Sequence, residues 1–89
     1  MANFLYTHQL AMTNREIFIM NLLLAEEGKE YIIQQIKTDD EELDAFLFSL
    51  GCYSGEPITV VSRKKKSCTV AIKDARYNID LQLAEAIIV

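Results

Sequence analysis

Hydrophobic and polar residues alternate from Lys29 to Lys37, which is the pattern of a β-strand. Tyr31 and Ile33 fall on one face of this strand, and Ile32 and Ile36 fall on the other. A strand with apolar residues on both faces is either central to a small barrel or covered on its outside. We expect the helix that follows it to provide this cover.

The segment after this strand has the signals of a helix. Thr38 and Glu41 have the spacing of a capping box, in which both side chains satisfy free amides of the first turn. The acids from Asp39 to Glu42 also oppose the positive end of the helix dipole. Gly51 supplies the left-handed residue that ends the helix. One buried stripe is predicted at helical spacing, formed by Leu43, Phe46, Leu47 and Leu50, and Phe48 lies off it, where it is partly exposed or widens the buried face.

The second half of the chain predicts further short strands. Ile58–Ser62 is rich in β-branched residues, Cys68–Lys73 alternates, and Arg76–Ile79 is a third strand. The basic run Arg63-Lys64-Lys65-Lys66 lies between the first two, and we interpret it as a solvated hairpin tip in preference to a nucleic-acid or lipid contact. Asp80 can cap a helical turn through Leu81 to Glu85, and Ala86–Val89 closes the chain as an apolar strand.

These elements predict a mainly β fold: a small, partly open, SH3-like β-barrel with one α-helix inserted after the second strand and a short helical turn before the last strand. The chain has 89 residues, the size of one domain. We assign residues 21–89 to the barrel. Residues 1–20 form an N-terminal extension without a clear period, in which Met12 and Met20 are alternative starts and residues 15–20 suit a strand or one helical turn.

Composition narrows the setting. The net charge is −4, and an acidic chain is repelled by nucleic acid unless its bases gather on one face, so we expect no nucleic-acid partner. The apolar stretch Ile17–Leu24 is too short to span a bilayer, so neither a signal peptide nor a membrane anchor is expected. Cys52 and Cys68 form no C-x-x-C pair, which favours a reducing cytoplasm and two buried small hydrophobic side chains.

Catalytic and metal chemistry find few candidates in the sequence. The single histidine, His8, lies in the extension, so we expect no enzyme and no catalytic residue. The acids from Asp39 to Asp44 suit helix capping better than cation binding, because consecutive residues diverge around a helix. We expect no metal site and no cofactor, and no glycine-rich phosphate loop is present.

Three pieces of the sequence occur in a characteristic order: Leu24-x-x-x-Gly28-x-x-Tyr31-x-Ile33-x-x-Ile36, Leu47-x-x-Leu50-Gly51-x-x-x-Gly55-x-x-Ile58-x-Val60, and Leu83-Ala84-x-x-Ile87-x-Val89. Together they resemble the FeoA family (ferrous iron transport protein A), whose members are compact SH3-like barrels. The sequence departs from the family pattern at Cys52, where a larger aliphatic residue is usual, and at Ser54, where proline often precedes the glycine. The N-terminal extension has no counterpart in that pattern.

The resemblance implies a cytosolic accessory protein of bacterial ferrous iron uptake, which binds and regulates the FeoB membrane GTPase. GTP hydrolysis then belongs to the partner, and self-association of this chain is left open. The expected contact surface is the helix end and its connector, where an aromatic residue lies beside flexible backbone. It comprises Phe48, Leu50, Gly51, Tyr53, Ser54 and Gly55. A purely structural role for Leu50 and Tyr53, closing one end of the barrel, is an equal alternative.

Two other functions stay open at this point. One is a detached SH3-like regulatory domain related to the C-terminal domain of iron-dependent transcriptional repressors. The absence of a helix-turn-helix pattern in this sequence makes it second to the first hypothesis. Binding of a proline-rich peptide ranks last, because such grooves are lined by aromatic residues and this chain has no tryptophan.

Overall fold

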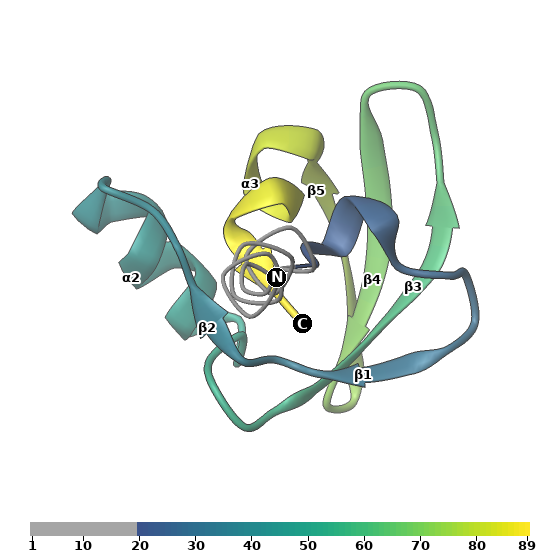
Figure 1. Ribbon diagram of the computed structural model, residues 1–89, viewed down its shortest axis with the longest axis horizontal. Helices are drawn as coiled ribbons and strands as arrows, with labels where there is room; N and C mark the ends of the chain where they lie inside the picture. The colour runs from purple at the N-terminus through teal and green to yellow at the C-terminus, as the bar shows by residue number, and fades with distance from the viewer. Residues whose placement is uncertain (1–19) are drawn as a thin grey trace, which may run out of the picture.

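A four-stranded antiparallel sheet forms most of the barrel wall in the computed structural model, which describes residues 20–89 (Figure 1). A two-stranded sheet joins the beginning of the barrel to the end of the chain. The larger sheet has the order β1 (Glu30–Ile32), β3 (Pro57–Arg63), β4 (Ser67–Ile72) and β5 (Ala75–Asp80), and the smaller one pairs β2 (Gln35–Ile36) with β6 (Ile87–Ile88).

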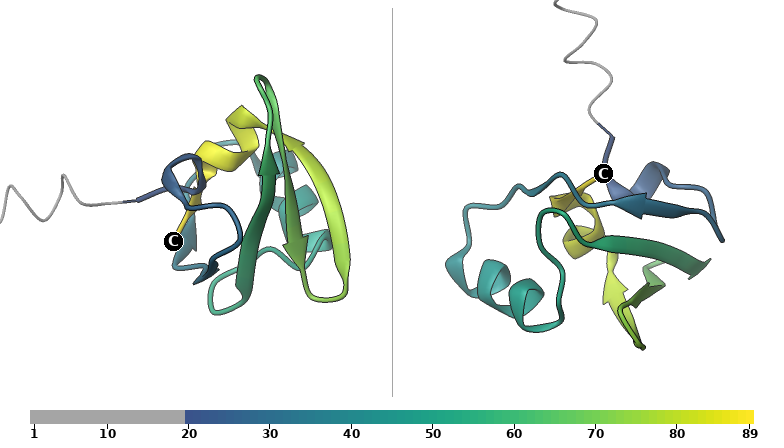
Figure 2. Two further views of the ribbon diagram at one scale, coloured as in Figure 1. Left: turned by 90° about the vertical axis from the view of Figure 1, so that its right-hand side faces the viewer. Right: turned by 90° about the horizontal axis from the view of Figure 1, so that it is seen from below.

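Three helical segments complete the described fold. The 3-10 turn η1 (Leu22–Leu24) lies beside α3 (Leu81–Ala86) near the centre of the barrel. The longest helix, α2 (Glu41–Ser49), stands apart on one side, as Figure 1 and the right-hand view of Figure 2 show. The insertion of α2 after the second strand and the position of α3 before the last strand confirm the predicted order of elements.

The core is entirely apolar. Strand β4 buries Cys68, Val70 and Ile72, which alternate with partly exposed residues and confirm the face predicted for this strand. Strand β3 buries Ile58 and Val60 against them. No buried polar or charged residue occurs between residues 20 and 89, so burial of apolar surface is the main source of stability.

The single strand predicted from Lys29 to Lys37 is wrong. The chain leaves the large sheet after Ile32 and enters the small sheet at Gln35, so β1 and β2 belong to different sheets. Between them Ile33 is 1% exposed and belongs to the core cluster. Ile32, by contrast, is 47% exposed, so α2 does not cover the outer face of this strand as we predicted.

The start of α2 also differs from the prediction. Asp40, and not Thr38, is the N-cap: its Oδ1 accepts from the backbone N–H groups of Glu42 (2.9 Å) and Leu43 (3.3 Å). The Thr38 hydroxyl oxygen instead accepts from the N–H of Asp40 (3.1 Å). A short local turn therefore precedes the helix, because aspartate is as good a capping residue as threonine and lies nearer the first apolar position.

The predicted apolar stripe on this helix is only partly buried. Leu47 is the one residue of α2 that is fully buried, whereas Leu43 and Leu50 are half-buried. Phe46 is 47% exposed, so its assignment to the buried stripe is wrong. Phe48 is exposed, which is one of the two alternatives predicted for it. The face of the helix that is buried against the barrel is narrower than the predicted stripe, because the helix lies beside the barrel and does not cover it.

The predicted hairpin between β3 and β4 is confirmed, with a register shift between Val60 and Ser62. Lys64, Lys65 and Lys66 are exposed at its tip. Arg63 is not part of a solvated tip: its Nη2 donates to the carbonyl oxygens of Leu22 (3.2 Å) and Ala25 (2.7 Å). This arginine therefore fastens the hairpin to η1 and to Ala25, which follows it; the Leu22 carbonyl oxygen also accepts from the N–H of Ala25 (3.2 Å).

The end of the chain folds largely as the sequence predicts. Asp80 caps α3 by accepting from the N–H of Leu83 (2.8 Å), and β6 follows the helix directly. The N–H of Val89 donates to the carbonyl oxygen of Met20 (2.8 Å). The other residues of the predicted N-terminal extension, His8 among them, lie outside the described part of the chain.

Replacing Arg63 with methionine tests this fastening. The apolar stem keeps its volume, but the carbonyls of Leu22 and Ala25 lose a charged donor, so we expect the free energy of unfolding to fall by about 2 kcal/mol. Denaturant unfolding monitored by circular dichroism measures this loss. The control, Lys64→Met, removes an exposed cation and should change stability by less than about 0.5 kcal/mol. Equal stability of the two variants would show that these bonds contribute nothing.

Candidate functional site

An aromatic pair marks the C-terminal end of α2. The rings of Phe48 and Tyr53 lie with their centroids 4.8 Å apart and their planes tilted by 33°. Phe48 is 65% exposed and Tyr53 is half-buried. Aromatic pairs of this geometry interact favourably and keep each other in place. The two residues therefore form a preorganised apolar feature on the surface.

The end of the helix brings these two rings together. Gly51 has φ +91°, the left-handed conformation predicted for it. The next N–H, that of Cys52, donates to the carbonyl oxygen of Leu47 (2.9 Å), and the buried Cys52 side chain turns inward. The reversal at Gly51 sends the chain back along α2, which sets Tyr53 beside Phe48.

The connector that carries Tyr53 is fastened to the crossing between the two sheets. The hydroxyl of Ser54 donates to the carbonyl oxygen of Gln34 (3.0 Å), and the N–H of Gly55 donates to that of Ile33 (2.8 Å). Gly55 has φ +93°. Ile33 and Gln34 lie between β1 and β2, where the chain passes from one sheet to the other. Their carbonyl oxygens have no partner in either ladder, so the connector supplies the hydrogen-bond donors.

Lys73 completes the site from the turn between β4 and β5. Its Nζ lies 2.5 Å from Oε1 of Glu56 and 5.3 Å from the centroid of the Tyr53 ring. The hydrogen bond to Glu56 raises the pKa of Lys73, so the ammonium is charged at neutral pH. Its stem also fills the space beside Gly51, where a Cβ would come within 2.8 Å of the Lys73 Cε. Lys73 thus holds both ends of the connector.

The six residues predicted as a contact surface all lie at the end of α2 and in the connector after it, but they differ in exposure. Phe48, Ser54 and Gly55 are exposed, Leu50 and Tyr53 are half-buried, and Gly51 is buried. Lys73 was missed by the sequence analysis, because it lies on another element and no local pattern points to it. Two surface hollows adjoin the aromatic pair: Leu50, Lys73 and Tyr77 line one, and Ile36, Asp44 and Ala45 line the other.

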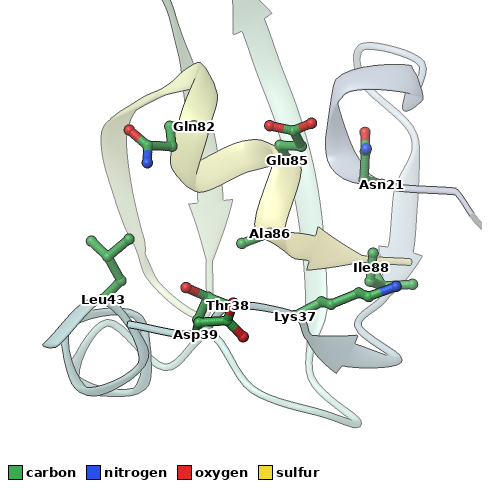
Figure 3. A pocket seen from close by; sticks show the side chains of 9 residues that line it. All are labelled: Asn21, Lys37, Thr38, Asp39, Leu43, Gln82, Glu85, Ala86 and Ile88. Carbon is green, nitrogen blue, oxygen red and sulfur yellow. The ribbon is translucent and has the colours of Figure 1, made fainter. Parts of the chain in front are cut away.

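A third hollow separates α2 from α3 (Figure 3). Leu43 projects into it from α2, while Gln82 and Glu85 project from α3. The remaining side chains are mixed in character: Asn21, Lys37, Thr38, Asp39, Ala86 and Ile88. Within residues 20–89 no group of three or more histidine, cysteine, aspartate or glutamate side chains is placed to share a metal ion.

Both cysteines are free and buried. Burial raises the pKa of Cys52 to about 11, because an apolar environment disfavours the thiolate. Burial also raises the pKa of Cys68, although the positive charge of Arg63 opposes this shift. Both side chains belong to the core cluster, as the sequence analysis predicted. No helix in the described part of the chain is long and apolar enough to cross a membrane.

Comparison with known proteins identifies a family. A family model described as the FeoA domain matches residues 20–89. A sequence comparison with curated proteins finds no match. Among solved structures, a manganese-dependent transcriptional repressor is similar, with 22% identity and a TM-score of 0.74 over 81% of this chain and 41% of the repressor. This chain therefore spans about two fifths of the repressor's length.

Two further similar structures are those of small proteins. The iron uptake regulatory protein FeoA has 19% identity and a TM-score of 0.71, with 80% of this chain and 95% of that chain covered. FeoA of Stenotrophomonas maltophilia, complexed with zinc and described as a prokaryotic SH3 domain protein, has 14% identity and a TM-score of 0.70, covering 79% and 89%. At these identities the likeness establishes the fold, and it confirms the predicted SH3-like barrel.

Alanine substitutions at Gly51 and Gly55 separate the cost of left-handed backbone strain from the cost of a clash with the Lys73 side chain. Gly55→Ala meets no atom within 4 Å, so it should cost only the left-handed strain of about 1 kcal/mol. Gly51→Ala adds displacement of the Lys73 side chain and should cost more. Denaturant unfolding in the wild-type and Lys73→Ala backgrounds measures both. We expect the difference between the glycine variants to shrink when Lys73 is absent; an unchanged difference would contradict the role of Lys73.

Thiol labelling checks the burial of the two cysteines. Because the thiolate is the reactive species and burial raises both thiol pKa values, the native protein should react much more slowly with iodoacetamide than the unfolded protein at neutral pH. Mass spectrometry after timed quenching follows each site. Folding favours the protonated Cys52 thiol, because its pKa is higher in the folded than in the unfolded chain. The stability that this preference provides is present below the pKa of the unfolded chain, and it is lost as the pH rises from there towards 11. Fast native labelling would show that the core is open at these positions.

Proposed function

Because this chain belongs to the FeoA domain family, we propose that it is a cytosolic accessory protein of ferrous iron uptake that binds the FeoB membrane GTPase. In this role it regulates GTP hydrolysis by the transporter and performs no chemistry itself. The observation that carries the proposal is the exposed Phe48–Tyr53 pair on a fastened connector. The six residues predicted from the sequence, together with Lys73, form the proposed contact surface.

The energetics of this surface suit protein binding. Phe48 leaves most of its ring in water, and burial of that ring by a partner releases water from apolar surface. Aromatic residues held in one orientation are typical energetic centres of interfaces, because little side-chain entropy is lost on binding. Hydrogen bonds from Ser54 and Gly55 hold the connector before the partner arrives. The surface therefore requires little reorganisation.

The charges around the pair indicate the partner's chemistry. Glu41 and Asp44 line the hollow on the α2 side, whereas Lys73 lies on the other side and is already paired with Glu56. The free charge next to Phe48 and Tyr53 is therefore negative. A partner with an apolar pocket and a basic rim on the α2 side would match this arrangement.

The sequence supports the assignment of GTP binding to the partner and not to this chain. Its three glycines are Gly28, Gly51 and Gly55, and none lies in a phosphate-binding loop pattern. GTP binding is therefore assigned to the partner. Binding energy at the aromatic pair can alter hydrolysis only if it differs between two states of that partner.

The second candidate is a regulatory domain that acts on a transcription factor. It is supported by the likeness of this chain to part of a manganese-dependent repressor. The family match favours the first candidate, since the repressor likeness concerns the shared fold. Recovery of a DNA-binding protein in place of the GTPase from reducing extracts would favour the second.

Alanine variants of the aromatic pair test the proposal. Detergent-solubilised FeoB is assayed for GTP hydrolysis with increasing amounts of this protein, and binding is measured by calorimetry. Wild-type protein should change the hydrolysis rate, and Phe48→Ala and Tyr53→Ala should each weaken binding roughly 10-fold or more. Circular dichroism confirms that each variant folds.

The matched control is Leu24→Ala, because Leu24 is 68% exposed but lies on η1, outside the proposed surface. This variant should behave as the wild type. An unchanged hydrolysis rate with wild-type protein, at concentrations that saturate binding, would refute regulation. Equal binding by all three variants would refute the surface.

A further inference from the structure

The tip of the β3–β4 hairpin concentrates positive charge on an otherwise acidic protein. Lys64, Lys65 and Lys66 are all exposed there, whereas the whole chain has a net charge of −4. Figures 1 and 2 show the hairpin extending past the other elements of the barrel, on the side away from α2. Although the sequence alone favoured a solvated tip over a lipid contact, we propose that this tip binds the anionic headgroups of a phospholipid membrane surface.

The three lysines keep their charges available. Within residues 20–89 the one ion pair joins Lys73 to Glu56, and Lys73 lies at the opposite end of β4 from this tip. Two carboxylates lie at the strand residues that flank the tip, and neither forms an ion pair with a tip lysine: Glu27 accepts from the N–H of Arg63 (2.9 Å). Asp80, which lies opposite Ser67 in the ladder, caps α3. The ammonium groups therefore face solvent without a described anionic partner.

The tip is also well held. The N–H of Lys64 donates to the carbonyl oxygen of Ser67 (2.7 Å), which closes the turn. Below it, Arg63 donates to the carbonyls of Leu22 and Ala25 and fixes the hairpin against η1. Adjacent lysines on a fixed turn can approach a charged surface together, with only their side chains losing freedom.

A flat anionic surface fits this arrangement better than nucleic acid does. Specific duplex binding relies on many phosphate contacts spread over an extended face, and single strands are held by stacking on aromatic rings. The tip offers three cations and no aromatic residue from Arg63 to Ser67. A projecting tip can bring its three lysines to a flat surface together, ahead of the rest of the barrel (Figure 1).

The expected strength is modest. Each lysine near an anionic leaflet lowers the dissociation constant about five-fold, so three lysines together strengthen binding roughly 100-fold over a neutral tip. Such binding is reversible and weakens with salt. It goes beyond the proposed function and does not depend on it, because the ligand is the lipid surface itself.

Vesicle co-sedimentation tests the inference with the full chain and no transporter present. Vesicles containing phosphatidylglycerol and phosphatidylcholine are compared with vesicles of phosphatidylcholine alone, at low and high salt. Wild-type protein should bind only the anionic vesicles, and added salt should release it. The triple variant Lys64→Gln, Lys65→Gln, Lys66→Gln should bind them roughly 100-fold more weakly.

The matched control removes three exposed cations elsewhere: Lys29→Gln, Lys37→Gln, Arg76→Gln. It changes the net charge equally, so a loss as large as that of the tip variant would overturn the inference. Stronger binding of the wild type to duplex DNA than to anionic vesicles, at equal phosphate concentration, would also overturn it. Loss of FeoB binding by the tip variant in detergent would assign the tip to a protein contact, which contradicts the inference and leaves the proposed function intact.

Discussion

The crossing of the chain from one sheet to the other at Ile33 and Gln34 is the constraint on which the rest of this structure depends. The N–H of Ile33 donates to the carbonyl oxygen of Glu56, and that of Gln34 donates to the carbonyl oxygen of Ile88. Buried backbone groups must find such partners, and here they come from segments far apart in the sequence. One crossing therefore fixes the connector after α2 and the last strand together, and it closes the barrel.

This constraint also explains why the proposed contact surface is preorganised. The connector from Gly51 to Glu56 has to remain in place to satisfy the crossing, whether or not a partner is bound. Helix α2 has fewer buried residues than the connector has. Leu47 is its one fully buried residue, and the next buried side chain that anchors it is Cys52, just after its end. A helix held along so narrow a line leaves Phe46 and Phe48 in water. The exposed aromatic residues are thus a consequence of how the barrel closes.

The parts of the fold that depend on neighbours in the sequence could be predicted from it. The alternation of Cys68, Val70 and Ile72, the left-handed Gly51 and the cap at Asp80 are local features, and the structure has all three. The break of the Lys29–Lys37 strand could not be predicted, because both halves share one alternating pattern and only their distant partners differ. Lys73 was missed and Arg63 was assigned to a solvated tip for the same reason: the residues that each of them contacts lie on other elements.

The distribution of charge relates the two proposed surfaces to each other. Acidic residues crowd the start of α2, from Asp39 to Asp44, while the three tip lysines extend from the opposite side of the barrel (Figure 1). Near an anionic leaflet such a distribution favours an orientation with the tip towards the lipid. Phe48 and Tyr53 follow from the far end of that helix, beside the barrel and not on the tip. Lipid contact at the hairpin would therefore leave the aromatic pair uncovered, so both surfaces could be occupied at once, and each would limit the orientations that the other has to search.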